Sequence, residues 1–282
     1  MNNLLLHLRR NGQLTTGLVV LLIMFVGWLT AYLVVDIKSA APLSASPDSK
    51  PSLEYPLGVD SAGRNLLAVM VAGAPTTLRI GLIAGSLGML IGTILGFTAG
   101  YFGGLADSII RTMADVALAV PALAVLVVIA SVITTQLSPT VLAFIIAALA
   151  WMFPTRTIRA QVLTMRERAY VEVARLSGLN NFEIIFRELM PNLLPYLAAS
   201  FVGAVGAAVL AAIGLEALGL GPQSEPTLGM TIFWARYYNA ILRGMWWWWA
   251  PPVIIIILMF IGLFMVAAGL DAIANPRSRR TA

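Results

Sequence analysis

The chain has 282 residues, of which 59% are hydrophobic and 11% charged, with a formal net charge of +5. A water-soluble domain is typically about half apolar and about a quarter charged, so this composition excludes a single soluble core and places most of the chain in lipid. Without cysteine, disulfides, thiolate catalysis and zinc–cysteine sites are excluded. The positive charge does not indicate nucleic acid, because the 18 basic residues lie between apolar spans, where they set membrane orientation.

The chain is predicted to begin with a cytoplasmic tail over residues 1–15, which holds the single histidine. His7 has no second ligand-type side chain beside it, so it is interpreted as a tail residue and no metal site is predicted. The apolar run over residues 16–35 exceeds the about 7–15 residues of a signal-peptide core, and it predicts a first transmembrane helix.

A segment rich in proline and serine follows over residues 36–75 and is predicted to be an extracytoplasmic linker with a turn at Pro56-Leu57-Gly58. A further set of apolar stretches then approaches the about 20 residues that a spanning helix needs. They cover residues 77–101, 109–134, 139–153 (extended through Thr157), 193–215 and 250–270. Pro121 and Pro195 are expected to kink the spans that contain them.

Arginine and lysine are distributed unevenly about these six predicted spans. With the N-terminus inside, twelve basic residues fall on inner segments and six on outer ones, and the excess lies in the loop after the fourth span and in the tail 272–282. The positive-inside rule therefore predicts that both termini are cytoplasmic.

The second long outer segment, residues 216–249, is rich in glycine and proline. It is interpreted either as an ordered loop that dips toward a translocation path or as a plain surface loop. Trp246 to Trp249 directly precede the last span and favour an aromatic belt at the membrane–water interface, with stacking on cargo as the alternative.

The second span repeats glycine every three or four residues, which places these glycines on one helical face. Small residues on a membrane helix let another backbone approach closely, so the predicted role is helix packing and not a binding site. The glycines are Gly81, Gly85, Gly88, Gly92, Gly96 and Gly100.

Asp115 is the main acid expected within a span, and Arg111 precedes it by four residues. An ion pair one helical turn apart is the favoured interpretation, with a proton relay or a cargo contact as the alternative.

The inner loop, residues 158–191, carries the most informative local pattern. Charged and apolar residues alternate with helical periodicity, and Gly178 then suits the left-handed position that ends a helix. Asn180 or Asn181 can cap a second short helix, with Glu183 in its favourable first turn. The pattern predicts a helix, a sharp turn and another helix.

Pro191 is expected to end the second short helix just before the fifth span. An amphipathic helix lying on lipid is the alternative, but glutamates are mixed among the arginines of this loop. That mixture favours a protein partner.

Glu172-Val173-Ala174, followed by Gly178 and Pro191, resembles the EAA loop of ATP-binding-cassette (ABC) importer permeases, with Val173 replacing the usual middle alanine. The resemblance implies that this loop couples to an ATPase. The residues that it assigns to coupling are Glu172, Val173, Ala174, Gly178, Asn181, Glu188 and Pro191.

The segment from Pro56 is similar to the P-L-G-x-D-x-x-G-R-D motif of the dipeptide/oligopeptide/nickel permease family, second (C-type) subunit. Its matching residues are Gly58, Asp60, Gly63 and Arg64. The similarity extends from about Pro56 to Asn275-Pro276-Arg277 and covers nearly all of the chain between them. Departures occur at Glu188, where the family often has histidine, near Asp271, and at the tryptophan run.

This resemblance implies an all-α membrane protein with six transmembrane helices, the type I ABC importer permease fold over residues 76–271, in the inner membrane of a prokaryote. It also implies a homologous second permease, two ATPase subunits that bind ATP and Mg²⁺, and an external solute-binding protein. No phosphate-binding loop is present in the sequence, since neither Lys38 nor Lys50 follows the required glycine. The chain is therefore expected to be a transport subunit without bound cofactor and not an enzyme.

Peptides are the first choice of cargo, with oligosaccharides or nickel complexes as alternatives. A secondary transporter driven by an ion gradient is the rival class, but such proteins tend to show inverted repeats and polar residues at the midplane. The sequence shows no internal repeat and only Asp115 as a coupling acid. A membrane scaffold without transport activity is the third interpretation, but it would not explain why glycine-rich spans and a basic loop occur in the same chain.

Overall fold

The computed structural model describes residues 11–133 and 137–274. His7 and the Asn275-Pro276-Arg277 motif lie outside the described residues. Within the described ranges the chain is helical, and its β-structure is limited to an isolated bridge between Val59 and Asn65.

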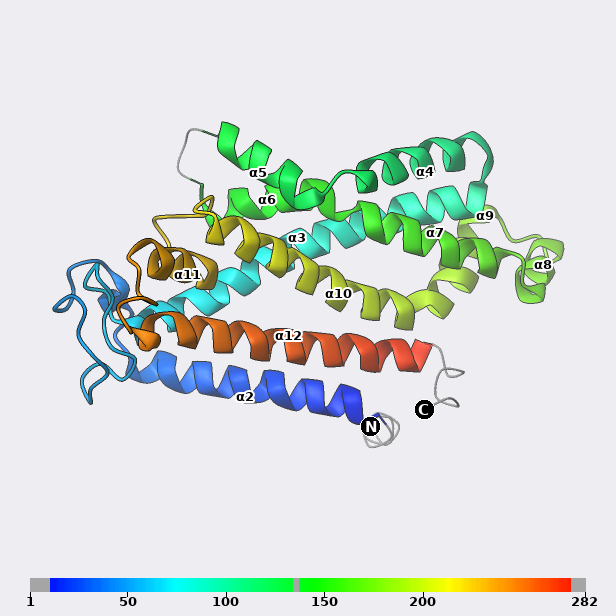
Figure 1. The fold of residues 1–282 in the computed structure, drawn as a ribbon. Helices are drawn as coiled ribbons and strands as arrows, with labels where there is room; N and C mark the ends of the chain where they lie inside the picture. The colour runs from blue at the N-terminus through cyan, green and yellow to red at the C-terminus, as the bar shows by residue number, and fades with distance from the viewer. Residues whose placement is uncertain (1–10, 134–136, 275–282) are drawn as a thin grey trace.

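The long helices run side by side along the length of the molecule, with α8 at one end and α11 near the other (Figure 1). In chain order the long elements are α2 (Gly12–Val34), α3 (Leu66–Phe102), α4 (Gly104–Ala119), α5 (Ala122–Val132), α6 (Pro139–Ala150), α7 (Met152–Arg166), α10 (Met190–Ala217) and α12 (Trp246–Ala274). The short elements are η1 (Ile37–Ala40), α8 (Ala169–Leu176), α9 (Asn181–Glu183), the π-helical turn η2 (Ile184–Leu189) and α11 (Leu228–Tyr237).

Among the described residues, five helical segments are long and apolar enough to cross a membrane, or six if the bent pair α4–α5 counts as one span. The α6 and α7 helices together form one such segment, Pro139–Arg166, so the fourth predicted span extends well beyond Thr157. The chain is therefore a multi-pass helical membrane protein.

The third predicted span is divided at Pro121, where α4 and α5 meet at 81°. Val120 has an extended backbone (φ −91, ψ 131), because the ring of a following proline disfavours the helical region. The predicted kink at Pro121 is thus confirmed and is sharp enough to break the span. Pro195, by contrast, lies inside α10, which continues through it.

Helix α3 starts at Leu66, eleven residues before the predicted span, so the end of the predicted linker is helical. Asn65 caps the helix by accepting a hydrogen bond from the Leu67 backbone N–H (3.1 Å). Pro75 lies inside α3 and cannot donate to the Val71 carbonyl one turn earlier. The indole N–H of Trp28 on α2 donates to that carbonyl instead (2.8 Å), which explains how the helix passes this proline.

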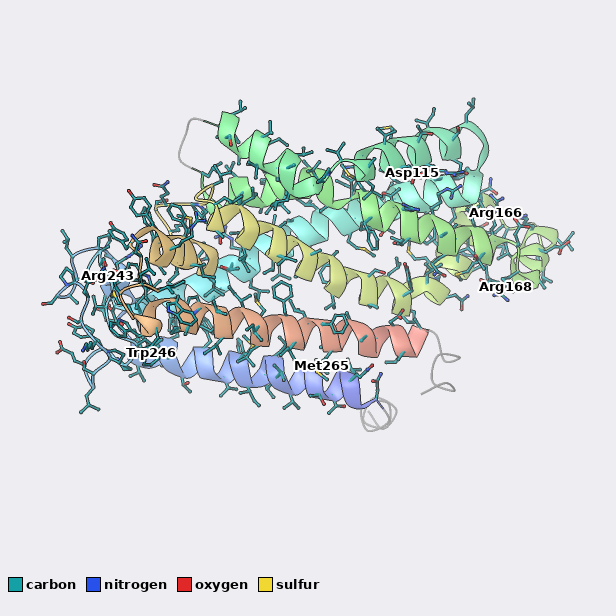
Figure 2. The ribbon with its side chains drawn as sticks, in the orientation of Figure 1. Asp115, Arg166, Arg168, Arg243, Trp246 and Met265 are labelled. Carbon is teal, nitrogen blue, oxygen red and sulfur yellow. The ribbon has the colours of Figure 1, made fainter. Side chains whose placement is uncertain are left out.

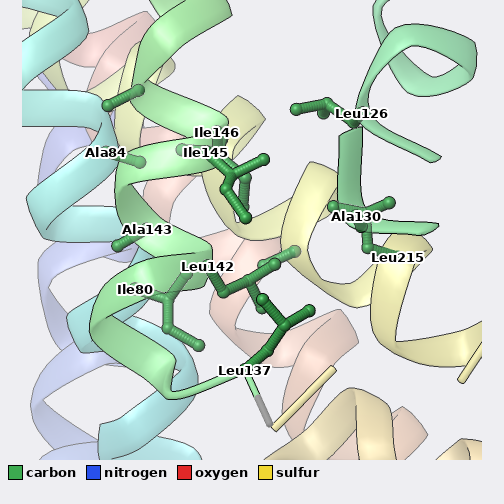
Figure 3. Close-up of a cluster of buried hydrophobic side chains, with 13 residues drawn as sticks. Ile80, Ala84, Leu126, Ala130, Leu137, Leu142, Ala143, Ile145, Ile146 and Leu215 are labelled. Atoms are coloured by element: carbon green, nitrogen blue, oxygen red, sulfur yellow. The ribbon is translucent and has the colours of Figure 1, made fainter. Parts of the chain in front are cut away.

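Helix α3 lies at the centre of the fold, between α6 and α7 on one side and α10 on the other, and α12 packs against both α2 and α10. Figure 3 shows the apolar cluster where α3, α5, α6 and α10 meet, built around side chains such as Ile80, Leu142 and Leu215.

The glycine face of α3 meets different helices along its length. Gly81 and Gly85 face Val209 and Val205 on α10, and an added Cβ at Gly85 would lie only 2.7 Å from the Val205 Cα. The glycines further along meet Ala150 at the end of α6 and then α7: Gly88, Gly92, Gly96 and Gly100. Both neighbouring backbones approach α3 closely because these side chains are absent.

The outer segment 216–249 is ordered and contains α11. Trp248 is fully buried and Trp247 is 7% exposed, in a cluster that includes Leu66 and Met245. The prediction of an aromatic belt is therefore wrong for these two residues, because the outer segments fold over them. Trp246 is 56% exposed.

Candidate functional site

The inner helix–turn–helix begins with α8, which ends at Leu176 and is followed by the capping residue Ser177. Gly178 follows with φ +84, and its N–H donates to the Arg175 carbonyl (3.0 Å) while the Leu179 N–H donates to the Ala174 carbonyl (3.2 Å). This pattern satisfies the last carbonyls of the helix and requires a left-handed residue. A Cβ at Gly178 would meet nothing within 4 Å, so glycine is needed here for its backbone conformation and not for space.

The second short helix starts at Asn180. Its side-chain oxygen accepts from the Glu183 N–H (3.0 Å), and the Glu183 carboxylate accepts from the Asn180 N–H (3.0 Å). This reciprocal pair is a capping box. Asn181 has a different role, because its side-chain oxygen accepts from the Tyr101 hydroxyl at the end of α3 (3.0 Å). The turn is thereby tied to the inner end of the central helix.

The prediction that Pro191 ends this helix is wrong. The chain continues from α9 through the π-helical turn η2 directly into α10, and together they form one helical segment, Asn181–Ala217. Pro191 stands in the first turn of α10. Because the segment is continuous, the ring removes one backbone hydrogen bond, and the π-helical turn η2 directly before it marks where the regular helical pattern is interrupted.

The loop presents an apolar surface at the end of the molecule, which we term the inner apolar surface. It is defined by four exposed side chains on α8, α9 and η2: Val173 (60% exposed), Leu176 (83%), Phe182 (67%) and Phe186 (59%). Glu172 and Arg175 are also exposed beside it. An exposed apolar patch rimmed by mixed charge is typical of a surface that docks a protein.

The predicted coupling residues are divided between this surface and the support beneath it. Ala174 is buried with Val171 in a cluster that includes Ile184 and Leu189, which packs α8 against η2. Glu188 is half-buried. The exposed members are Glu172, Val173, Gly178, Asn181 and Pro191.

Charged side chains connect α4 to α7 near this end of the molecule (Figure 2). The predicted pair is present, with the Arg111 Nε 3.4 Å from the Asp115 carboxylate, and Arg156 on α7 approaches the same carboxylate at 3.9 Å. A stronger pair was missed by sequence reasoning: Arg159 donates twice to Asp107, with Nη2 to Oδ2 at 2.6 Å. These two residues are 52 positions apart, so no local pattern marks them.

The charged groups line a cavity of about 270 Å³ between α4 and α7. Arg111 is 63% exposed and Asp115 is 41% exposed in the isolated chain. The arrangement fixes the angle of α4 on α7 chiefly through Asp107 and Arg159.

The motif with Gly58, Asp60, Gly63 and Arg64 forms a tight turn at the other end of the molecule. Asp60 is 1% exposed and accepts from the N–H groups of Ala62 and Arg64 (both 2.9 Å) and from the Arg64 Nε (2.7 Å). Gly58 and Gly63 have φ +68 and +76. The motif residues thus build the turn that leads into α3.

Asp60→Ala is expected to loosen this turn. The substitution leaves two backbone N–H groups and the Arg64 guanidinium without their acceptor, which costs about 1–3 kcal/mol of unfolding free energy. The midpoint of thermal unfolding in detergent should fall, while the exposed neighbour Glu54→Gln should leave it unchanged. Equal midpoints for the two variants would contradict this role for Asp60.

A second set of polar contacts joins the outer loops. Arg243, which lies at the opposite end of the molecule from Arg166 and Arg168 (Figure 2), donates to Asp48 (2.5 Å) and to the Ser61 hydroxyl (2.9 Å). Partial burial opposes ionisation of Asp48, but the hydrogen bonds from Ser61 and Arg243 and the charge of Arg243 outweigh it. Together they hold the pKa of Asp48 below its ordinary 3.8.

This lowered pKa predicts that the interaction between Arg243 and Asp48 weakens in acid. A carboxyl group with a lowered pKa in the folded state contributes stability above its unfolded pKa and loses it as the pH falls through the folded value. The unfolding midpoint of the wild type should therefore drop more steeply below about pH 4 than that of Arg243→Gln, which lacks the pair. Parallel pH profiles for the two proteins would show that the pair contributes nothing.

Comparison with known proteins identifies the class of this fold. A chain of the MetNI methionine ABC transporter, in an inward-facing conformation, superposes with a TM-score of 0.53 at 19% identity, covering 72% of this chain and 97% of that one. Residues 92–280 match the family described as the binding-protein-dependent transport system inner membrane component.

Relatives by sequence agree in class, and each match covers more than two thirds of this chain. The chain is 30% identical to the glutathione transport system permease protein GsiD of Pectobacterium atrosepticum over 77% of this chain and 71% of that protein. It is 29% identical to a putative peptide transport system permease of Brucella abortus (96% and 90% covered) and 28% identical to the dipeptide permease DppC of Bacillus subtilis (97% and 85%). The chain belongs to this family and is a permease subunit of an ABC importer.

Proposed function

We propose that the chain forms half of the translocation path of a prokaryotic inner-membrane importer for peptides, paired with a homologous second permease. Two ATPase subunits would bind ATP and Mg²⁺ and power the importer, and an external solute-binding protein would deliver the cargo. The relatives described above are named as permeases for glutathione, for peptides and for dipeptides, which supports peptides as the cargo.

The inner apolar surface is the observation that carries the proposed coupling. Four large apolar side chains stand exposed on a short helix–turn–helix whose backbone is fixed by Gly178 and by the Asn180 cap. A separate ATPase would cover them. Glu172, Val173 and Asn181, whose coupling role is part of this proposal, are exposed on or beside this surface.

The connection from this surface into the membrane supports transmission of movement. The helical segment Asn181–Ala217 has 37 residues and starts within the inner apolar surface. At about 1.5 Å per residue it is roughly 55 Å long and reaches the outer side of the fold. Displacement of its inner end by an ATPase would therefore move its outer end as well, as in coupling through rigid elements.

The proposed orientation places this loop and both termini in the cytoplasm. The exposed arginines of the loop, such as Arg168 and Arg175, then lie on the side that the positive-inside rule requires. The linker before α3 and the α11 segment would face the solute-binding protein.

Uptake of a radiolabelled dipeptide by liposomes tests this proposal. The chain would be reconstituted with its co-purifying permease, ATPase and binding-protein partners, and with ATP supplied to the ATPase side. Uptake of dialanine that requires hydrolysable ATP is expected, with no competition by maltotriose or by a nickel–histidine complex. Competition by either compound would indicate that the importer carries that class of compound and not peptides. Uptake by the chain alone under an ion gradient would overturn the importer and support a secondary transporter.

A further inference from the structure

Glu216 is a buried acid on the last turn of α10 that none of the preceding functions uses. Sequence reasoning assigned it to the outer loop, but it lies inside α10 and its side chain is fully buried. Neither carboxylate oxygen has a hydrogen-bond partner among the described residues. A buried carboxylate is expensive unless its charge is compensated, so a residue needed only for packing would be apolar here.

The carboxylate lies against the N-terminus of α11. An added Cβ at Gly229, in the first turn of α11, would collide with Glu216 Oε2 and would lie 3.1 Å from the Ile213 Cα of α10. An added Cβ at Gly221 would lie 2.7 Å from the Glu216 Cγ. Both glycines therefore make room for this one side chain and allow the two helices to touch.

The first turn of α11 is held from two sides. From α3, the Thr77 hydroxyl oxygen accepts from the Leu228 N–H (3.0 Å), and Thr227 caps the helix by accepting from the Met230 N–H (3.1 Å). From α10, the carboxylate of Glu216 faces the Gly229 and Met230 N–H groups and the Thr227 hydroxyl without regular hydrogen-bond geometry. Helix N-termini carry a partial positive charge that favours an anion at this position.

We propose that Glu216 is a positioning residue for transport, which makes α11 follow the outer end of α10 when the inner loop is displaced. Its place supports this role, because the helical segment that begins at the inner apolar surface ends one residue after Glu216. The carboxyl group of Glu216 faces the donor groups of Thr227, Gly229 and Met230 at the start of α11, whereas Thr77 ties α11 to α3. The inference rests on the proposed coupling of the inner loop to an ATPase.

The test compares Glu216→Gln with the matched control Glu225→Gln in the reconstituted importer. Glutamine keeps the shape of the side chain but replaces one acceptor oxygen with an NH2 donor, which cannot accept from the start of α11, and Glu225 is an exposed acid in the same segment. ATP hydrolysis is measured with and without the binding protein loaded with dialanine. We expect Glu216→Gln to keep its unstimulated rate and to lose about tenfold in the stimulation by the binding protein, the size of a partly buried charge–helix interaction. Glu225→Gln should behave as the wild type.

A spin label on α11 measures the movement directly. The natural chain has no cysteine, so Arg236→Cys, at an exposed position on α11, accepts a single nitroxide. In the wild-type background its spectrum should change when ATP binds, and in the Glu216→Gln background that change should be lost. If Glu216→Gln does not assemble, Gly229→Ala displaces the carboxylate without removing its charge and should lose the same stimulation.

The possible outcomes separate this inference from the proposed function. A wild type without stimulation contradicts the proposed function itself. A stimulated wild type with an equally stimulated Glu216→Gln or Gly229→Ala overturns only the role of Glu216. If the unstimulated and the stimulated rates of ATP hydrolysis fall together, Glu216 has only a structural role, and this result also overturns the proposal.

Discussion

Leu176→Asp is expected to abolish ATP-driven transport while the permease stays folded. Leu176 is 83% exposed on α8, so the substitution removes no internal packing. It places a charge within the apolar surface proposed to dock the ATPase. Truncation of a central interface residue costs about 2 kcal/mol or more, which corresponds to at least about 30-fold weaker binding, and a buried unpaired charge adds to that loss.

The measurement is recovery of the ATPase subunits with the tagged permease from detergent extracts, together with the rate of stimulated ATP hydrolysis. Leu53→Asp is the matched control, because Leu53 is also fully exposed but lies on the outer linker. Undiminished recovery of the ATPase with Leu176→Asp would remove the inner apolar surface as the docking site.

Gly85→Leu is expected to prevent formation of the helix bundle. An added Cβ at this position would lie 2.7 Å from the Val205 Cα and 2.8 Å from its backbone nitrogen. The atoms that would have to move belong to the backbone of α10, which is held along its length by α3 and α12. Overpacking of a well-packed core typically costs about 1–3 kcal/mol, and a whole leucine against backbone falls at or beyond the upper end.

The yield of monodisperse permease and its unfolding midpoint in detergent report this effect. Gly27→Leu is the control, since Gly27 lies on an exposed face of α2 where an added Cβ meets nothing within 4 Å. Both substitutions add the same apolar group to a membrane helix. Similar yields for the two variants would show that the crossing of α3 and α10 tolerates a side chain.

The sequence was most informative where a feature is decided within one or two helical turns. The left-handed Gly178 and the capping by Asn180 and Glu183 follow from hydrogen bonds between near neighbours along the chain. The kink at Pro121 follows in the same way from contact between a proline ring and the preceding residue. The angle of that bend, 81°, depends on what packs against each half and was not predictable.

The sequence-based predictions were wrong where the surrounding structure overrode a local sequence signal. Pro75 and Pro191 are ordinary signals for the end or start of a helix, yet Trp28 satisfies the carbonyl freed by Pro75, and Pro191 stands in a first turn that follows a π-helical turn. The tryptophan run would mark the membrane interface if it were exposed. Trp248 is buried because the α11 segment and the start of α3 fold over it.

Composition and periodicity by themselves determined that this chain lies in lipid, spans the membrane several times and exposes a short helix–turn–helix on one side. The physical reason is that hydropathy, backbone conformation and capping are properties of short stretches of chain. Only the tertiary structure decided which helices the glycine face of α3 meets, that Asp107 pairs with Arg159, and that Glu216 is enclosed between α10 and α11. These contacts join residues distant in sequence, and they depend on how whole helices pack together.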